Sequence, residues 1–243
     1  MLDVHDDLEG LRRAMGLSVW SAPGPLVVGH RGGRGEGWPR ENTLAAFEQA
    51  RAQGARAIEL DVRTCSDEVI VLHDAPRESL RDLRAARVPT LVEVLAWARV
   101  EEVAVNVELK HDVPRRRAFA RATVAIVERS GADVLLSSFD PLLLAMCAAL
   151  APSLPRALLV HGRQRPWADA LQEAVRPPLV QALHLERTQT EPRAIARYLG
   201  RGLRVGVWTV NDPREAADLV QLGVASVITD APGAVLAAVT PRR

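Results

Sequence analysis

Residues 25–74 read PLVVGHRGGRGEGWPRENTLAAFEQARAQGARAIELDVRTCSDEVIVLHD. The apolar runs at 26–29 and 57–62 predict two short buried strands. Between them, the segment LAAFEQA predicts a helix that has Asn42 or Thr43 as its N-cap. The three elements have the length of a βαβ unit, so we expect the two strands to be parallel neighbours.

Ionisable residues stand at the ends of these strands. His30 and Arg31 close the first strand, and Glu59 and Asp61 lie two residues apart on the second, so both carboxylates face the same way. Two such carboxylates repel each other unless a cation or a proton lies between them, and carboxylate oxygens suit Mg²⁺ or Ca²⁺. The next apolar run, at 69–72, ends in His73. Two histidines beside a divalent cation suit acid–base chemistry on a phosphate ester.

A series of short motifs continues along the chain: HRG, PRENT, IELDV, VLHD, NVELK, SSFD, VWTVNDP and VITD. In this order they resemble the motifs of the glycerophosphodiester phosphodiesterases, from about residue 25 to residue 232. One departure is Arg40, which is inserted between the usual Pro and Glu of the PRENT motif. The resemblance implies a metal-dependent enzyme that hydrolyses a glycerophosphodiester to glycerol 3-phosphate and an alcohol.

The resemblance also implies roles for individual residues. Glu59, Asp61 and Glu108 match the family's ligands for a divalent metal, so we expect one Mg²⁺ or Ca²⁺. His30 and His73 match the catalytic pair, of which one takes a proton while the other gives one. The sequence does not indicate which histidine is the base.

Other residues are predicted to contact the substrate or to support the site. Arg31 and Lys110 supply positive charge for the phosphate, and by resemblance Trp208 lines the pocket against the alcohol. Residues expected around the ligands are Glu41, Asn42 and Asn211.

Each assignment has a structural alternative. The acidic pair could form salt bridges with Arg56 or Arg63, and Trp208 could belong to the core. Glu41 and Asn42 could simply mark a helix N-terminus. The remaining histidines lack such a context and are interpreted as structural or solvent-exposed: His5, His111, His161 and His184.

Strand-like and helix-like runs alternate through the rest of the chain. The predicted strands are 26–29, 57–62, 103–109, 134–137, 156–160, 179–185, 203–209 and 226–229. The predicted helices after the first are 115–129, 141–151, 167–175, 192–199, 213–222 and 232–239. Strands that alternate with helices imply a parallel sheet, and a length of 243 residues suits a (βα)8 TIM barrel. The run at 69–72 is then the return arm of a hairpin, and a doubly wound open sheet is the alternative.

The predicted barrel spans 25–243, and residues 1–24 form an N-terminal extension that packs on it. Leu8, Leu11, Met15 and Leu17 have rough helical spacing, which favours an added helix at the bottom of the barrel over a partner-binding arm. The family usually carries a longer insertion where this chain has only residues 74–87, which predicts a more open site. A helix follows, with Thr90 as N-cap and Glu93 as its capping-box partner.

Composition excludes several classes of protein. The formal net charge of +1 gives no electrostatic case for nucleic acid or an anionic membrane as the main partner. Cys65 and Cys147 form neither a disulfide framework nor a metal motif, so we interpret them as free thiols. We see no signal peptide and no apolar run long enough to anchor the chain in a membrane, and we expect a cytoplasmic enzyme of unknown oligomeric state.

The expected substrate is a small phosphodiester. Two other functions remain open at this stage. One is a phospholipase D-like phosphodiesterase that acts on lysophospholipids, which a reduced insertion over the site would permit. The other is a barrel that binds phosphodiesters without hydrolysing them.

Overall fold

The structure is a computed structural model that describes residues 18–162 and 176–240. The amphipathic stripe at 8–17 and the helix predicted at 167–175 lie outside the described residues. The domain division at residue 24 stays a prediction for the same reason.

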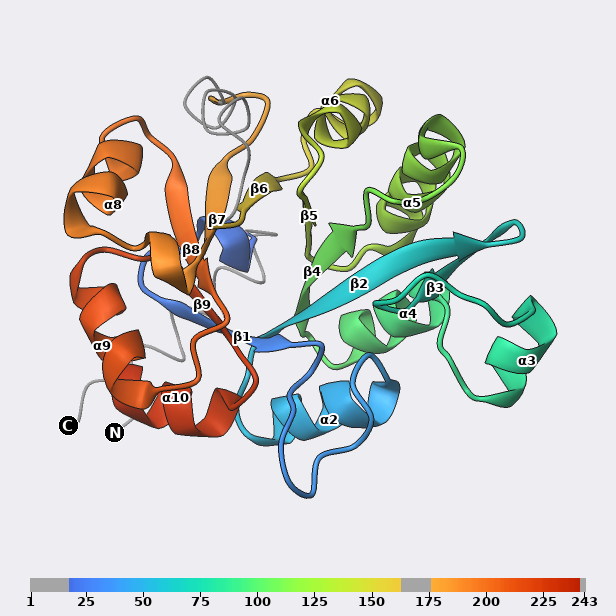
Figure 1. The fold of residues 1–243 in the computed structure, drawn as a ribbon, viewed down its shortest axis with the longest axis horizontal. Coiled ribbons are helices and arrows are strands. Elements are labelled where there is room, and N and C mark those ends of the chain that lie inside the picture. Colours follow the sequence, from blue (N-terminus) through green and yellow to red (C-terminus); the bar gives the residue numbers. More distant parts are fainter. Residues whose placement is uncertain (1–17, 163–175, 241–243) are drawn as a thin grey trace.

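Nine strands form one sheet. They are β1 (Leu26–His30), β2 (Ala57–Cys65), β3 (Glu68–Val71), β4 (Ala104–Leu109), β5 (Val134–Ser138), β6 (Arg156–Val160), β7 (Ala182–Glu186), β8 (Arg204–Trp208) and β9 (Ser226–Thr229). Their order is β1-β9-β8-β7-β6-β5-β4-β2-β3, and a further pairing of β1 with β2 closes the sheet. Strand β3 pairs antiparallel with β2 as the predicted hairpin arm. The other eight strands are parallel, which confirms the (βα)8 barrel (Figure 1).

Helices surround the barrel, and their starts follow from local sequence. They are α2 (Leu44–Ala52), α3 (Leu80–Ala85), α4 (Leu91–Val100), α5 (Arg116–Ser130), α6 (Pro141–Leu150), α8 (Pro192–Leu199), α9 (Pro213–Gln221) and α10 (Pro232–Val239). Thr90 and Glu93 form the predicted capping box of α4, and Asp140 caps α6 ahead of Pro141. No helix among the described residues combines the length and apolar character needed to cross a bilayer.

Alternation along the strands separates two packing layers. Outward-facing residues such as Leu60 and Val107 pack with helix residues such as Phe47 and Leu95 in one buried cluster. Inward-facing residues fill the barrel itself. Because both faces of a parallel strand are covered, the strands read as nearly continuous apolar runs wherever no site residue interrupts them.

The barrel is closed at the amino-terminal ends of its strands by small side chains and by Trp20. Small inward residues stand at or near the starts of four strands, namely Ala57, Ala104, Ala157 and Ala182. Trp20, in the short 3-10 helix η1 (Val19–Ser21), packs in the same cluster and is 6% exposed. The Ser18 hydroxyl donates to Asp133 Oδ1 at 2.7 Å. The described part of the extension therefore seals the barrel at the face opposite the strand carboxyl ends.

Two segments differ from the sequence prediction. The strand expected at 179–185 begins at Ala182, because the residues before it form a turn in which the Leu179 amide donates to Arg176 O at 3.0 Å. Arg156 donates to the carbonyls of Pro178 and Leu179 at 2.8 Å each, so these groups are satisfied outside the sheet. Residues 74–87, expected as a short charged connection, contain α3, which projects beside the β2–β3 hairpin (Figure 1).

A buried histidine inside the barrel makes stability depend on pH. His184 is 2% exposed, and burial lowers its pKa from 6.5 to about 4. Between these values the unfolded chain binds more protons than the folded chain, so stability falls as the pH falls from 6.5 towards 4. From pH 7.5 to pH 5 we expect His184 to account for a loss of about 2 kcal/mol, at roughly 1.4 kcal/mol per pKa unit.

Urea unfolding of the wild type and of His184→Gln at the two pH values measures this effect. Glutamine does not titrate, so the variant should lose about 2 kcal/mol less than the wild type over the same pH change. Equal losses in the two proteins would show that His184 does not resist protonation in the folded state.

Candidate active site

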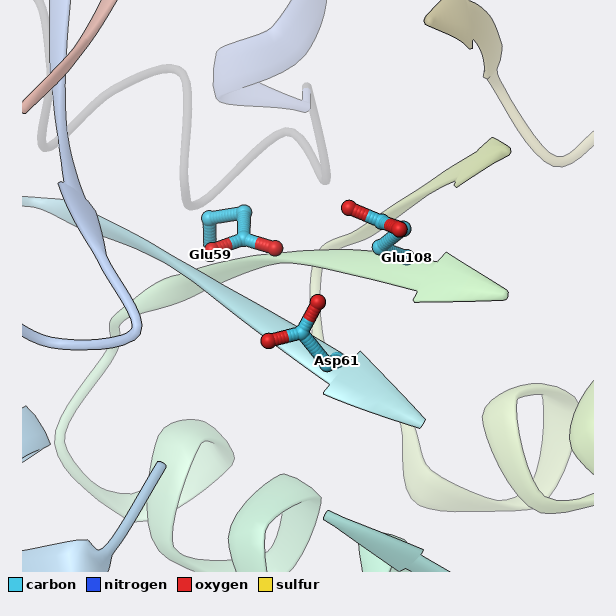
Figure 2. A group of neighbouring side chains, drawn as sticks. All are labelled: Glu59, Asp61 and Glu108. Carbon is cyan, nitrogen blue, oxygen red and sulfur yellow. The ribbon is translucent and has the colours of Figure 1, made fainter. Parts of the chain in front are cut away.

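Three carboxylates gather at the carboxyl end of the barrel. Glu59 and Asp61 come from β2 and Glu108 from β4, where Asp61 and Glu108 are direct partners in the strand register. One ligand oxygen from each lies within 4.8 Å of the others, and all three side chains are buried. Figure 2 shows them over the two adjacent strands. The sequence prediction of a shared acidic cluster agrees with this arrangement.

The electrostatics of this cluster favour a bound cation. Burial raises the pKa of Glu59 well above its ordinary value, and the charges of Asp61 and Glu108 raise it further. Burial and the charge of Asp61 also raise the pKa of Glu108. Glu59 Oε1 is buried and has no hydrogen-bond donor among the described residues. A hard divalent cation fits these three carboxylates, because its positive charge offsets their negative charges and because such cations are coordinated by carboxylate oxygens.

Two cations of the protein already lie beside the carboxylates. Lys110 Nζ is 2.6 Å from Asp61 Oδ1 and 2.7 Å from Glu108 Oε1. Arg31 Nε is 3.1 Å from Asp61 Oδ2, and the Arg31 amide donates to Glu59 Oε2 at 3.0 Å. Burial alone would raise the pKa of Asp61, but the charges of Lys110 and Arg31 outweigh burial and hold it below its usual range. Asp61 is therefore the carboxylate held ionised by the protein itself.

Glu41 and Asn42 of the PRENT motif do not begin the following helix, but contact charged side chains of the site. Thr43, not Asn42, is the N-cap of α2, and its hydroxyl accepts from the Ala46 amide. Asn42 is buried with a φ of 57°, and its Nδ2 donates to Asp61 Oδ2 at 2.8 Å. Glu41 lies outside the carboxylate cluster and pairs with Arg31 Nη1 at 2.7 Å. Asn42 therefore orients a carboxylate, whereas Glu41 orients an arginine.

His30 faces the carboxylate cluster from β1. Its Nε2 lies 3.9 Å from Glu59 Oε2, and its Nδ1 lies 2.8 Å from Asp230 Oδ1. Arg34 Nη2 lies further from Nδ1, at 3.3 Å, and a carboxylate can only accept, so we assign the ring proton to Nδ1. Burial lowers the pKa of His30 below that of a free imidazole, and the bond to Asp230 offsets only part of this. A neutral His30 therefore presents a free Nε2 lone pair to the site.

Asp230 was missed in the sequence analysis, although it ends the VITD motif. It follows β9, and Asn211 Nδ2 donates to its Oδ2 at 2.8 Å. Burial would raise its pKa, but hydrogen bonds from His30, Arg34 and Asn211 hold it well below its usual range. The signal that identified Glu59, a carboxylate at a strand end, could have identified Asp230 as well. The predicted supporting residue Asn211 thus reaches the site through Asp230.

His73 lies just beyond β3, and its surroundings differ from those of His30. Its side chain is 39% exposed, and its Nδ1 is 2.8 Å from Asp74 Oδ1, whose side chain is 91% exposed. The two histidines thus have contrasting environments: His30 is largely buried and hydrogen-bonded to a carboxylate, whereas His73 is exposed to solvent.

Aromatic side chains flank Trp208 at the end of β8. The ring centroids of Phe139 and Trp208 are 5.7 Å apart in an edge-to-face arrangement, and His161 is 6.1 Å from Trp208. Trp208 Nε1 donates to the His184 carbonyl at 3.0 Å, which fixes the indole. This half-exposed apolar wall agrees in kind with the predicted alcohol pocket, whose role stays a prediction.

Fold and site together define a class of protein: a (βα)8-barrel enzyme with a buried carboxylate cluster able to hold a divalent cation at the strand carboxyl ends. The family model described as the glycerophosphoryl diester phosphodiesterase family matches residues 30–84 and 74–234. The chain belongs to this family, as its motifs predicted.

Individual relatives agree with this assignment. A glycerophosphodiester phosphodiesterase of Caldanaerobacter subterraneus is 28% identical over 237 residues, covering 85% of this chain and 94% of that protein. A crystal structure from Silicibacter pomeroyi, provisionally named glycerophosphoryl diester phosphodiesterase, superposes with a TM-score of 0.79 at 26% identity and covers 91% and 95% of the two chains. An Oleispira antarctica phosphodiesterase shares the fold at 23% identity, with a TM-score of 0.75 and coverage of 88% and 96%.

Proposed function

We propose that the chain is a phosphoric diester hydrolase that converts glycerophosphodiesters to glycerol 3-phosphate and an alcohol. Membership of the family supports this reaction, and the Oleispira antarctica enzyme was solved with sn-glycerol-3-phosphate as its product. The observation that supports it most directly is the 3.9 Å between His30 Nε2 and Glu59 Oε2. At this distance His30 could act as a proton acceptor for a substrate held at the carboxylate cluster, which supports the proposal.

In this proposal Glu59, Asp61 and Glu108 hold one Mg²⁺ or Ca²⁺. When bound, the cation supplies positive charge that polarises the phosphate and offsets charge in the transition state. Lys110 and Arg31 add positive charge at the same place, and an arginine can bind two phosphate oxygens at once. The phosphate is thereby bound mainly by groups other than the histidines.

His30 is the general base. Its Nδ1–H is directed at Asp230, so its Nε2 can accept the proton of the nucleophile as the new bond to phosphorus forms. The nucleophile is either water or the neighbouring glycerol hydroxyl, which would form a cyclic phosphate that water then opens. The ionised Asp230 stabilises the imidazolium produced by this step.

His73 is the general acid, which gives its proton to the oxygen of the departing alcohol as the bond from phosphorus to that oxygen breaks. Its exposure to solvent allows it to exchange protons between turnovers. Trp208 and Phe139 offer the alcohol an apolar wall.

Phosphorus NMR of the product tests the proposed reaction. With glycerophosphocholine and Mg²⁺ or Ca²⁺ we expect glycerol 3-phosphate and choline. Choline phosphate as product would show that the other ester bond is cleaved. Turnover confined to lysophosphatidylcholine would instead identify the lysophospholipid phosphodiesterase, and binding of either diester without turnover would identify a non-catalytic barrel.

Asp230→Asn should slow the reaction without weakening substrate binding. The variant loses the charge that stabilises the His30 imidazolium, and its amide can donate to Nδ1 and favour the wrong tautomer, so we expect kcat to fall by about 10²–10⁴-fold. The Asp230 hydrogen bond raises the pKa of His30, so the acid limb of kcat/KM should move to lower pH. Asp212→Asn, at the N-cap of α9, is the matched control. A rate and a pH profile like those of the control would rule out a role for Asp230.

A further inference from the structure

We propose that Arg63 is the positioning residue for His73. The inference rests on the proposed function, because it assumes that His73 acts in the reaction. Arg63 lies on β2 two residues beyond Asp61, so its side chain leaves the strand on the same face as the carboxylate cluster. Neither the motifs nor the carboxylate geometry assigns it a task.

The contacts of Arg63 lead directly to the segment that carries His73. Its Nε donates to the His73 carbonyl at 2.7 Å, and its Nη1 is 2.8 Å from Asp112 Oδ1. The Arg63 side chain is only 7% exposed. A guanidinium buried to this extent is costly unless its donors are satisfied, so these contacts fix its position closely.

His73 itself has few other anchors. It follows the end of β3, and its side chain pairs with Asp74, whose carboxylate is 91% exposed and therefore holds the ring weakly. Among the hydrogen bonds of His73 within the described ranges, the one from Arg63 is partly buried, whereas the one to Asp74 is exposed, so the bond from Arg63 constrains His73 more strongly. A shift of about 1 Å at such a residue can cost roughly 100-fold in rate.

The Arg63 guanidinium connects three segments at the mouth of the barrel: strand β2, the segment of His73 and the connection from β4 to α5. Arg63 belongs to the strand of Glu59 and Asp61, and Asp112 follows Lys110 in the connection from β4 to α5. Arg63 therefore sets His73 relative to the two strands that provide the carboxylates. Lysine could keep the charge but cannot reach two partners with two differently placed nitrogens.

Steady-state kinetics of Arg63→Met and Arg63→Lys with glycerophosphocholine test this inference. We expect Arg63→Met to lower kcat by about 10–100-fold and to leave KM within a few fold, because the phosphate contacts remain. Arg63→Lys should lie between Arg63→Met and the wild type. Calorimetric titration with Mg²⁺ or Ca²⁺ should give the wild-type affinity, because Arg63 contacts none of the three carboxylates in the structure.

A double-mutant cycle separates positioning of His73 from general damage. If Arg63 acts through His73, the variant Arg63→Met/His73→Ala should be no slower than His73→Ala alone, within about twofold. Arg51→Met, which removes an outer ion pair to Glu48 on α2, is the control and should behave as the wild type. Melting temperatures establish that each variant is folded at the assay temperature.

Three results would overturn the inference while leaving the proposed function intact: wild-type kcat in Arg63→Met, a loss that multiplies with that of His73→Ala, or a fall in cation affinity as large as the fall in kcat. A fourth result, full activity of His73→Ala, would overturn the two-histidine mechanism and this inference together.

Discussion

Replacing His30 or His73 by alanine should lower kcat for glycerophosphocholine by about 10²–10⁴-fold, the range typical of lost general acid–base catalysis. KM should change much less, because in the proposed mechanism the phosphate is held by the cation, Arg31 and Lys110 and not by the histidines. The kcat/KM profile of the wild type should be bell-shaped, with its limbs set by the pair as a whole. His111→Ala, which removes a histidine outside the proposed pair that packs edge-on against Phe139, is the control.

A substrate with a very acidic leaving group assigns the two roles. A p-nitrophenyl diester needs little protonation as it departs, so it should restore most of the lost rate to His73→Ala but not to His30→Ala. Rescue of His30→Ala instead would exchange the roles. Near-normal turnover of the natural diester by both variants would show that the two-histidine mechanism is wrong.

The second large effect concerns the carboxylates. Glu59→Gln should weaken Mg²⁺ or Ca²⁺ binding by about 100-fold or more, since even groups that only support metal ligands typically contribute 10–100-fold. Activity at low cation concentration should fall with it, and a high concentration should restore part of the loss. Isothermal titration calorimetry measures the affinity, with Glu48→Gln on the outside of α2 as the control.

The effect of Glu59→Gln on the free energy of unfolding should change sign when the cation binds. Burial and the charges of Asp61 and Glu108 raise the pKa of Glu59, so its ionised form is unfavourable in the cation-free protein. Glu59→Gln should therefore stabilise the cation-free chain against urea unfolding. With saturating cation the wild type should be the more stable protein. Equal effects with and without cation would favour a purely structural role for Glu59.

Sequence reasoning located the parts of the site that follow from strand periodicity. Glu59 and Asp61 were predicted to face the same way because they lie two residues apart on one strand, and Glu108 was added by resemblance to the family's metal ligands. The oxygens of the three lie within 4.8 Å of one another. His30 was found by its place at the end of a strand. Parity along a strand and the common edge of parallel strands suffice for such predictions.

Hydrogen bonds and ion pairs between residues far apart in the sequence could not be predicted in this way. His30 and Asp230 are 200 residues apart, and they meet only because β1 pairs with β9 when the barrel closes. Arg63 was considered only as a salt-bridge partner for the acidic pair, yet it pairs with Asp112. The N-cap of α2 was left between Asn42 and Thr43, because capping preference is local and the bond from Asn42 to Asp61 is not.

The central claim is that a divalent cation at Glu59, Asp61 and Glu108 is required for hydrolysis of a glycerophosphodiester. The most direct measurement is the rate of glycerol 3-phosphate release from glycerophosphocholine by enzyme stripped with EDTA and dialysed, before and after stoichiometric Mg²⁺ or Ca²⁺ is added. The proposed mechanism predicts no detectable release from the stripped enzyme and recovery of the full rate with one of the two cations. Full activity in the stripped enzyme would contradict it.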